Sequence, residues 1–289
     1  MSENYERREI RSISSSVLPL AGGGIILAAG LVSAILSILS QGAREAYRIH
    51  SATMQSTSPN VIRSLSTLRR GHRTVRVGRG LSSASEAVKV STILTLANSG
   101  YLVENTPAIH QKLEVLRLAA TATEARNAQR SLIEELEGSH HRVFVKGLTL
   151  ACAKASIKAG FSSVQTTETS SGVVRVVATD FLGRALMTEV STRNTQEPRI
   201  VTEVMGISDK SCKQVMDIFD RALDEQGVKS SPPRRKFTGG VCEIEAALEF
   251  VRNNVEAERS SGVRAGKDKS CDIRRSQRLN QKTHIKQKA

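Results

Sequence analysis

The sequence predicts an α+β protein with an N-terminal transmembrane helix, a helical spacer, a small antiparallel meander sheet with two packed helices, and a disordered basic tail. Three observations lead to this prediction. Residues 17–40 are apolar, and no charged residue lies between Arg11 and Arg44. Residues 142–228 hold four β-branched runs of alternating polarity together with two helical stretches. Residues 259–289 are basic and contain few apolar side chains.

Composition limits both the core and the partners. Of the 289 residues, 39% are hydrophobic and only 3% are aromatic, with no tryptophan. Any core must therefore consist mainly of Leu, Ile, Val and Ala. The formal net charge is +14, which favours anionic partners such as nucleic acid or an acidic lipid surface. The excess lies in two blocks, +7 over residues 41–82 and +8 over residues 259–289, on either side of a nearly neutral middle.

The first segments are a polar N-terminus, residues 1–16, and the predicted membrane helix, residues 17–40. A helix of that length would measure about 36 Å at about 1.5 Å per residue, and the bilayer hydrocarbon is about 30 Å thick. A signal peptide and a buried soluble helix are the alternatives. The run is longer than a signal-peptide core, and no clean A-x-A site follows it. The wider arginine count favours a cytoplasmic C-terminal part.

Residues 41–82 are expected to form a basic juxtamembrane linker. Its arginines would be attracted to anionic lipid or to nucleic-acid phosphates, and a solvated flank that only sets membrane topology is the alternative. Together with the tail, this block supplies the predicted anionic-surface residues, which are Arg69, Arg70, Arg73, Arg76, Arg79, Arg274, Arg275 and Arg278.

Residues 83–138 are predicted to be a helical spacer. Ser83 and Glu86 have capping-box spacing and begin a first helix, which ends near Gly100. Thr106 and Pro107 begin a second, longer helix with a capping residue followed by proline. Gly138 is expected to end it.

Residues 142–228 are predicted to be a small α+β domain. The alternation of RVFVK, residues 142–146, indicates a short strand, and residues 148–159 a helix that ends at Gly160. Four further strands are expected within residues 161–204, followed by a helix over 210–226 that ends at Gly227. The predicted order is β-α-β-β-β-β-α.

The remaining segments are a linker with a short helix, residues 229–258, and the basic tail, residues 259–289. The linker prediction rests on the composition of SSPPRRKFTGG. The tail is expected to be disordered. It has no interleaved aromatic side chains, so it predicts charge attraction and no stacking on bases.

No catalytic signature is found. The sequence contains no GxxxxGK[ST] loop, no HExxH and no GxSxG elbow, and its four cysteines form no CxxC pair. His140 and His141 are interpreted as part of a turn, Asp180 as a turn-stabilising residue, and Cys212 as a buried thiol. We therefore expect no enzyme, no metal and no cofactor.

A resemblance adds a partner class. Residues 143–227, with VVRVVATDFLGRALMTEV and IVTEVMGISDKSCKQVMDIFDRALDEQG, resemble the small domains of bacterial FtsH ternary systems. The resemblance implies an accessory protein beside an FtsH-like AAA+ ATPase and carries over no catalytic residue. The predicted function is a membrane-anchored, single-pass, non-enzymatic accessory or adaptor protein with a protein partner and an anionic lipid surface. The alternative is a basic nucleic-acid-binding protein.

Overall fold

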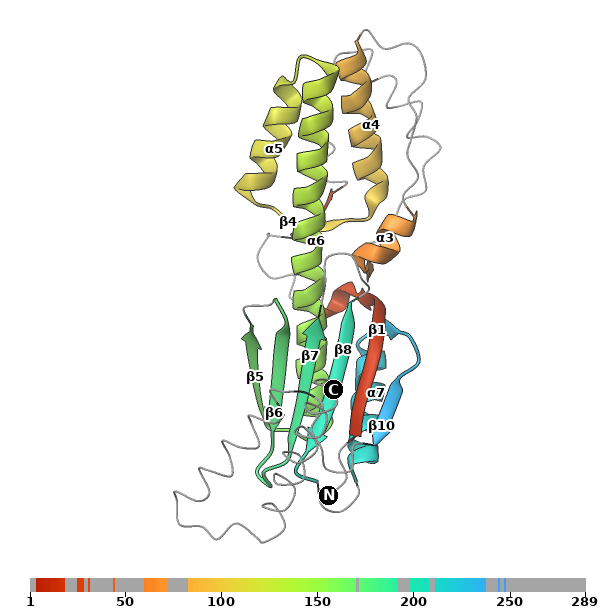
Figure 1. Cartoon of the computed structure of the whole chain (residues 1–289), viewed down its shortest axis with the longest axis vertical. Helices are drawn as coiled ribbons and strands as arrows, with labels where there is room; N and C mark the ends of the chain where they lie inside the picture. Colours follow the sequence, from red (N-terminus) through yellow and green to blue (C-terminus); the bar gives the residue numbers. More distant parts are fainter. Residues whose placement is uncertain are drawn as a thin grey trace, which may run out of the picture.

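The computed structural model describes residues 4–18, 25–28, 31, 44, 60–71, 83–169, 172–191, 198–207, 211–237, 244 and 247. Figure 1 shows an elongated molecule in which one long helix, α6, passes from a group of helices at one end to a sheet at the other. The helices are α3 Leu65–Gly71, α4 Ala84–Ser99, α5 Pro107–Leu118, α6 Ala122–Lys158 and α7 Cys212–Glu225, and η1 Ser15–Val17 is a 3-10 turn. The strands are β1 Asn4–Ser14, β2 Ile25–Leu27, β3 Val61–Arg63, β4 Leu102–Glu104, β5 Ser163–Glu168, β6 Val174–Thr179, β7 Ala185–Ser191, β8 Arg199–Met205, β9 Lys229–Ser230 and β10 Arg234–Phe237.

The main sheet is antiparallel, in the order β10-β1-β8-β7-β6-β5. Strands β5 to β8 form the predicted meander, which confirms the α+β class with an antiparallel sheet and helices. The inner face of the sheet, which carries Val176, Leu186 and Ile200, packs against α6 and α7. The outer face carries Met187 and Met205 and contacts Ile244 and Ala247.

The N-terminal segment differs from the prediction. Residues 1–16 were expected to be a polar terminus, but Asn4–Ser14 form β1, which lies between β8 and β10 inside the sheet. Its second half also pairs with β3 and β9, and a register shift between Ile10 and Ser12 marks an irregularity. Such a shift alters which side chains face the core, and both Ile10 and Ile13 are fully buried.

Helix α6 corrects a second prediction. We expected one helix from Thr106 and Pro107 to Gly138 and a strand over residues 142–146. The structure instead ends α5 at Leu118, begins α6 at Ala122, and continues α6 as a single 37-residue helix through Gly138 and residues 142–146. Thr121 and Glu124 form a capping box at its start. Val143, Phe144, Leu148 and Cys152 are buried along it, so RVFVK contributes to a helical stripe with spacings of three and four residues. The predicted spacer and α+β domain therefore share one helix, and no boundary separates them at 138–142.

The other predicted caps are present. Ser83 accepts a hydrogen bond from the Glu86 N–H at the start of α4, and Gly100 follows that helix with a φ of 64°. Thr106 caps α5, and Pro107 is its first residue. Gly227, after α7, also has a positive φ. These helix ends are set by local chemistry, which is why the sequence predicts them.

The apolar run, residues 17–40, is described only in part. Val17 and Leu18 are buried in the core around the sheet, and Ala28 and Leu31 in the core of the helical end. Ile25–Leu27 form a strand paired with β4, so these three residues are not part of a continuous helix. Among the described residues, no helix combines the length and apolarity that crossing a bilayer requires. The rest of this run lies outside the described residues.

The predicted linker is also partly ordered. Residues 229–230 and 234–237, expected to be irregular, form β9 and β10 beside β1. Of the predicted helix within 229–258, only Ile244 and Ala247 are described, and both are buried. The basic tail, residues 259–289, lies outside the described residues.

Candidate functional site

The predicted anionic-surface arginines are not gathered into one site by the part of the chain that is described. Arg69 is bound to Glu137 of α6 through two guanidinium nitrogens, with Nε at 3.0 Å from Oε1. The Tyr101 hydroxyl donates to the same carboxylate at 3.0 Å. Arg69 therefore joins α3 to α6. Arg70 donates to the Ser66 carbonyl of its own helix. The other predicted arginines lie outside the described residues: Arg73, Arg76, Arg79, Arg274, Arg275 and Arg278.

His140 connects three elements rather than lying in a turn. The Leu102 N–H donates to its Nδ1 at 2.9 Å, and its Nε2 donates to the Arg63 carbonyl at 2.8 Å. This pair of contacts requires the neutral imidazole with its proton on Nε2. Burial lowers the pKa of His140, against the opposing effect of the hydrogen bonds with the backbone of Arg63 and Leu102. The histidine thus fixes β3 and β4 to α6.

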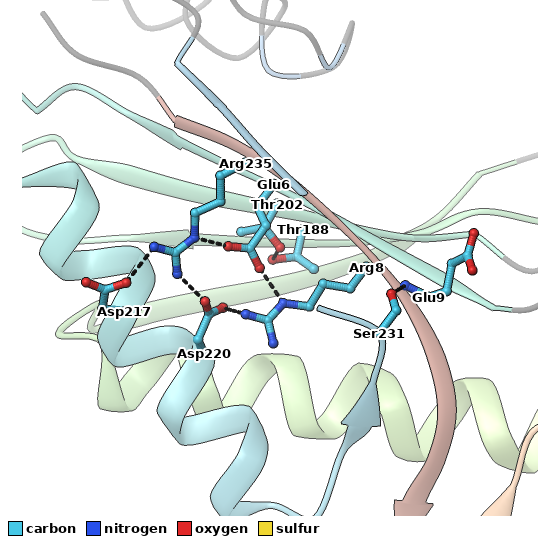
Figure 2. A network of polar contacts seen from close by, with 9 residues as sticks. All are labelled: Glu6, Arg8, Glu9, Thr188, Thr202, Asp217, Asp220, Ser231 and Arg235. Carbon is cyan, nitrogen blue, oxygen red and sulfur yellow. Dashed lines mark hydrogen bonds and ion pairs between the residues drawn. The ribbon is translucent and has the colours of Figure 1, made fainter. Parts of the chain in front are cut away.

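A network of charged side chains, buried at Glu6 and Arg8 and partly exposed at Arg235 and Asp217, lies between β1, β10 and α7 (Figure 2). Glu6 and Arg8, on the inner face of β1, are 2% and 5% exposed. Arg235 donates from Nε to Glu6 at 2.6 Å, from Nη1 to Asp217 at 2.5 Å, and from Nη2 to Asp220. Arg8 pairs with Glu6 and Asp220. Two guanidinium groups thus bridge three carboxylates from two elements.

Each carboxylate of the network is paired with at least one guanidinium group. Burial, together with the neighbouring Glu6 carboxylate, raises the pKa of Asp220 to about 6, although Arg8 and Arg235 act in the opposite direction. The hydroxyls of Thr188 and Thr202 lie 3.4 Å apart beside it. Each of these guanidinium groups is committed to carboxylates. No group of acidic, histidine or cysteine side chains that could hold a metal ion occurs among the described residues.

A small pocket lies next to this network, where the chain between β9 and β10 bends away from β1. Its volume is about 260 Å³, and it is lined by Arg7, Arg8, Glu9, Ser231, Pro232, Pro233 and Arg234. Ser231 holds the bend by two bonds to Glu9: its Oγ accepts from the Glu9 N–H at 3.0 Å, and its N–H donates to the Glu9 carbonyl at 2.8 Å. The prolines have no N–H, so this part of the sheet edge offers no ladder donor.

The turn between β6 and β7 combines a hydrogen-bonded backbone with exposed apolar side chains. Asp180, whose side chain is 1% exposed, accepts from the N–H groups of Leu182 and Arg184, both at 2.9 Å. Its other oxygen pairs with the Arg184 guanidinium at 2.5 Å. Gly183 takes a φ of 73°. The backbone is therefore fixed, yet the two side chains at the tip point into solvent, with Phe181 88% and Leu182 63% exposed.

Asp180 and Cys212 thus occupy the places expected of them. Asp180 stabilises a turn, and Cys212 is 2% exposed in the first turn of α7. Sequence reasoning missed the charge network, because Glu6 and Arg8 belong to the segment that was predicted to be a polar N-terminus ahead of a membrane helix. Their spacing of two, with Ile10 next in phase, was the available signal for a strand.

Comparison with protein-family models, curated proteins and solved structures finds no match for this chain. The resemblance of residues 143–227 to FtsH ternary systems therefore stays a prediction.

Proposed function

We propose that the protein is a non-enzymatic adaptor that docks onto a protein partner through Phe181 and Leu182 at the β6–β7 turn. The observation that carries this proposal is the combination of a fixed backbone with two exposed apolar side chains. Asp180 and Gly183 already supply what the turn needs. The side chains of Phe181 and Leu182 contribute almost nothing to the folded core, so they are free to contact a partner.

A protein pocket fits this tip better than a lipid surface. The nearest cation along the chain, Arg184, is neutralised by Asp180 within the turn, so it adds little attraction to anionic lipid. An aromatic anchor on a rigid turn loses little conformational entropy on binding and is typical of interface hot spots. Full burial of one such side chain is worth about 1.5–3 kcal/mol. Two therefore suffice to change affinity more than tenfold, since a tenfold change needs about 1.4 kcal/mol.

The test is quantitative co-purification of the tagged full-length chain from its native cells. We expect the double variant Phe181→Ser/Leu182→Ser to lose at least about 90% of a specific partner while keeping its unfolding midpoint. Val115 and Leu118 of α5 supply the matched control, because they are an equally apolar pair that is 55% and 66% exposed. Their replacement by serine should leave the partner bound. Equal recovery with both double variants would refute docking through the turn. An AAA+ ATPase among the recovered partners is the outcome that the resemblance favours.

Membrane attachment is a second proposal, made for residues 17–40. It is supported by the absence of charge between Arg11 and Arg44. The burial of Val17, Leu18, Ala28 and Leu31 in the protein cores weighs against it. Ultracentrifugation of the full-length chain without detergent separates the two outcomes. Recovery in the membrane pellet after an alkaline wash supports the anchor, whereas a chain that stays in the supernatant rules the anchor out.

A further inference from the structure

The strand pair β1 and β10 has an attractive charge pair on its inner face and a repulsive one on its outer face. On the inner face, Glu6 is the direct partner of Arg235, and the two form an ion pair. On the next rung, facing outward, Arg7 is the direct partner of Arg234. Like charges placed directly opposite each other destabilise an antiparallel pair. The inner pair fixes the register, so the two outer arginines are forced to face each other.

Neither outer arginine is neutralised within the described part of the chain. Arg7 and Arg234 have no ion pair or hydrogen bond from a side chain there, unlike Arg8 and Arg235 one residue away. The nearby carboxylate, Glu9, lies 3.9 Å from Arg199 on β8, and the buried Nε of Arg199 has no hydrogen-bond partner. The two other carboxylates that the register places on this face are also engaged: Glu189 pairs with Arg175, and Glu203 accepts from the Ile244 N–H.

The uncompensated pair opens onto a space of suitable size. Arg7 and Arg234 both line the pocket of about 260 Å³ at the β9–β10 bend, which is smaller than the range of about 300–1,000 Å³ typical of drug-sized ligands. The Ser231 hydroxyl in the same pocket can donate a hydrogen bond. Guanidinium groups recognise oxyanions through two parallel N–H bonds, so these donors suit a compact anion with several oxygens.

We propose that this pocket binds a small oxyanion of the phosphate class, held by the guanidinium groups of Arg7 and Arg234 with the Ser231 hydroxyl as a further donor. The ligand is free phosphate or the phosphate group of a small molecule. The inference is independent of docking at the β6–β7 turn, because no residue is shared between the two sites and either can fail alone.

The test is calorimetric titration of the full-length chain with inorganic phosphate and, in a second arm, with glycerol 3-phosphate, at constant ionic strength with chloride as the exchanged anion. We expect saturable binding that Arg7→Gln or Arg234→Gln weakens at least tenfold. Arg126→Gln, an exposed arginine of α6, should bind as the wild type does. Tighter binding of glycerol 3-phosphate would identify a phosphorylated small molecule as the ligand, and tighter binding of phosphate the free anion.

A charge reversal keeps the test independent of folding. Arg234→Glu gives Arg7 an opposite charge across the strand pair, so the unfolding midpoint without phosphate should equal or exceed that of the wild type. Phosphate should then raise the midpoint of the wild type and leave that of Arg234→Glu unchanged. No saturable heat with either probe, or an equal midpoint rise in wild type and Arg234→Glu, would overturn the proposal.

Discussion

Arg8 lies with its guanidinium group between the carboxylates of Glu6 and Asp220, and its side chain is 5% exposed. A buried ion pair contributes modestly when intact, but removal of one partner leaves an uncompensated charge in a poorly solvated place. In this network the loss of Arg8 would leave three carboxylates to Arg235 alone. The free energy of unfolding should therefore depend strongly on Arg8.

Arg8→Met should lower the free energy of unfolding by about 3–5 kcal/mol at pH 7, measured by urea denaturation. The loss should shrink toward pH 4, because Asp220, with a pKa already raised to about 6, becomes protonated and no longer needs a counter-ion. Arg11→Met, an exposed position of the same strand, is the control and should change stability by no more than about 0.5 kcal/mol. An equal effect of both substitutions would show that the network is not buried.

His140 makes the folded chain less stable as the pH falls. Its pKa is lowered in the folded chain, while an unfolded histidine titrates near about 6.5. Below that pH the unfolded chain binds a proton that the folded chain refuses, so the stabilisation present at pH 7 is lost as pH falls. His140 should therefore contribute a fall in the free energy of unfolding between pH 7 and 5.

The free energy of unfolding of the His140→Gln variant should fall less between pH 7 and 5. A glutamine amide can accept from the Leu102 N–H and donate to the Arg63 carbonyl without titrating. The remaining slope should combine His141, whose pKa burial also lowers, with Asp220, whose raised pKa acts in the opposite direction. Parallel pH curves for the wild type and His140→Gln would contradict the assignment of a neutral, buried His140.

At the scale of elements, the sequence predicts what local chemistry determines. The caps at Ser83, Thr106 and Gly227 and the alternation of β5 to β8 carry their own signals. Strand β1 lacks an apolar alternation, because its inward positions Glu6 and Arg8 are charged and are stabilised by partners more than 200 residues away in the chain, such as Arg235. Glycine at 138 is likewise ambiguous, since its helical cost of about 1 kcal/mol is offset by packing along α6.

A matched pair of glycine substitutions tests the continuity of α6. At Gly138 an added methyl group would meet only an Arg142 nitrogen at 3.6 Å, whereas at Gly147 it would come within 2.6 Å of Ile13 Cδ1. Gly138→Ala should raise the free energy of unfolding by up to about 1 kcal/mol through helix propensity. The free energy of unfolding of Gly147→Ala should be about 1–3 kcal/mol lower than that of Gly138→Ala, because the added methyl group overpacks the core. A destabilising Gly138→Ala would indicate a helix end there.

For the whole molecule, the length of α6 is the organising fact. It contributes Leu132 and Leu136 to the core of the helical end and Val143 to Ala155 to the core against the sheet. The two ends are therefore joined by a continuous helix (Figure 1), and the β6–β7 turn is presented by a sheet anchored on that helix. The pairing of Arg7 with Arg234 could not be predicted from sequence, since it depends on the register of strands far apart in the chain. The turn at Phe181 is set by local residues, but the sequence does not show that its apolar side chains stay uncovered.

The docking claim is tested most directly by a photo-crosslinking amino acid placed at Phe181 in the full-length chain, in intact cells. We predict one dominant crosslinked protein at this position and none of that species when the same group replaces Val115, which is exposed on α5. The docking claim would be contradicted if position 181 gave no crosslink, crosslinked only to lipid, or gave the same products as position 115.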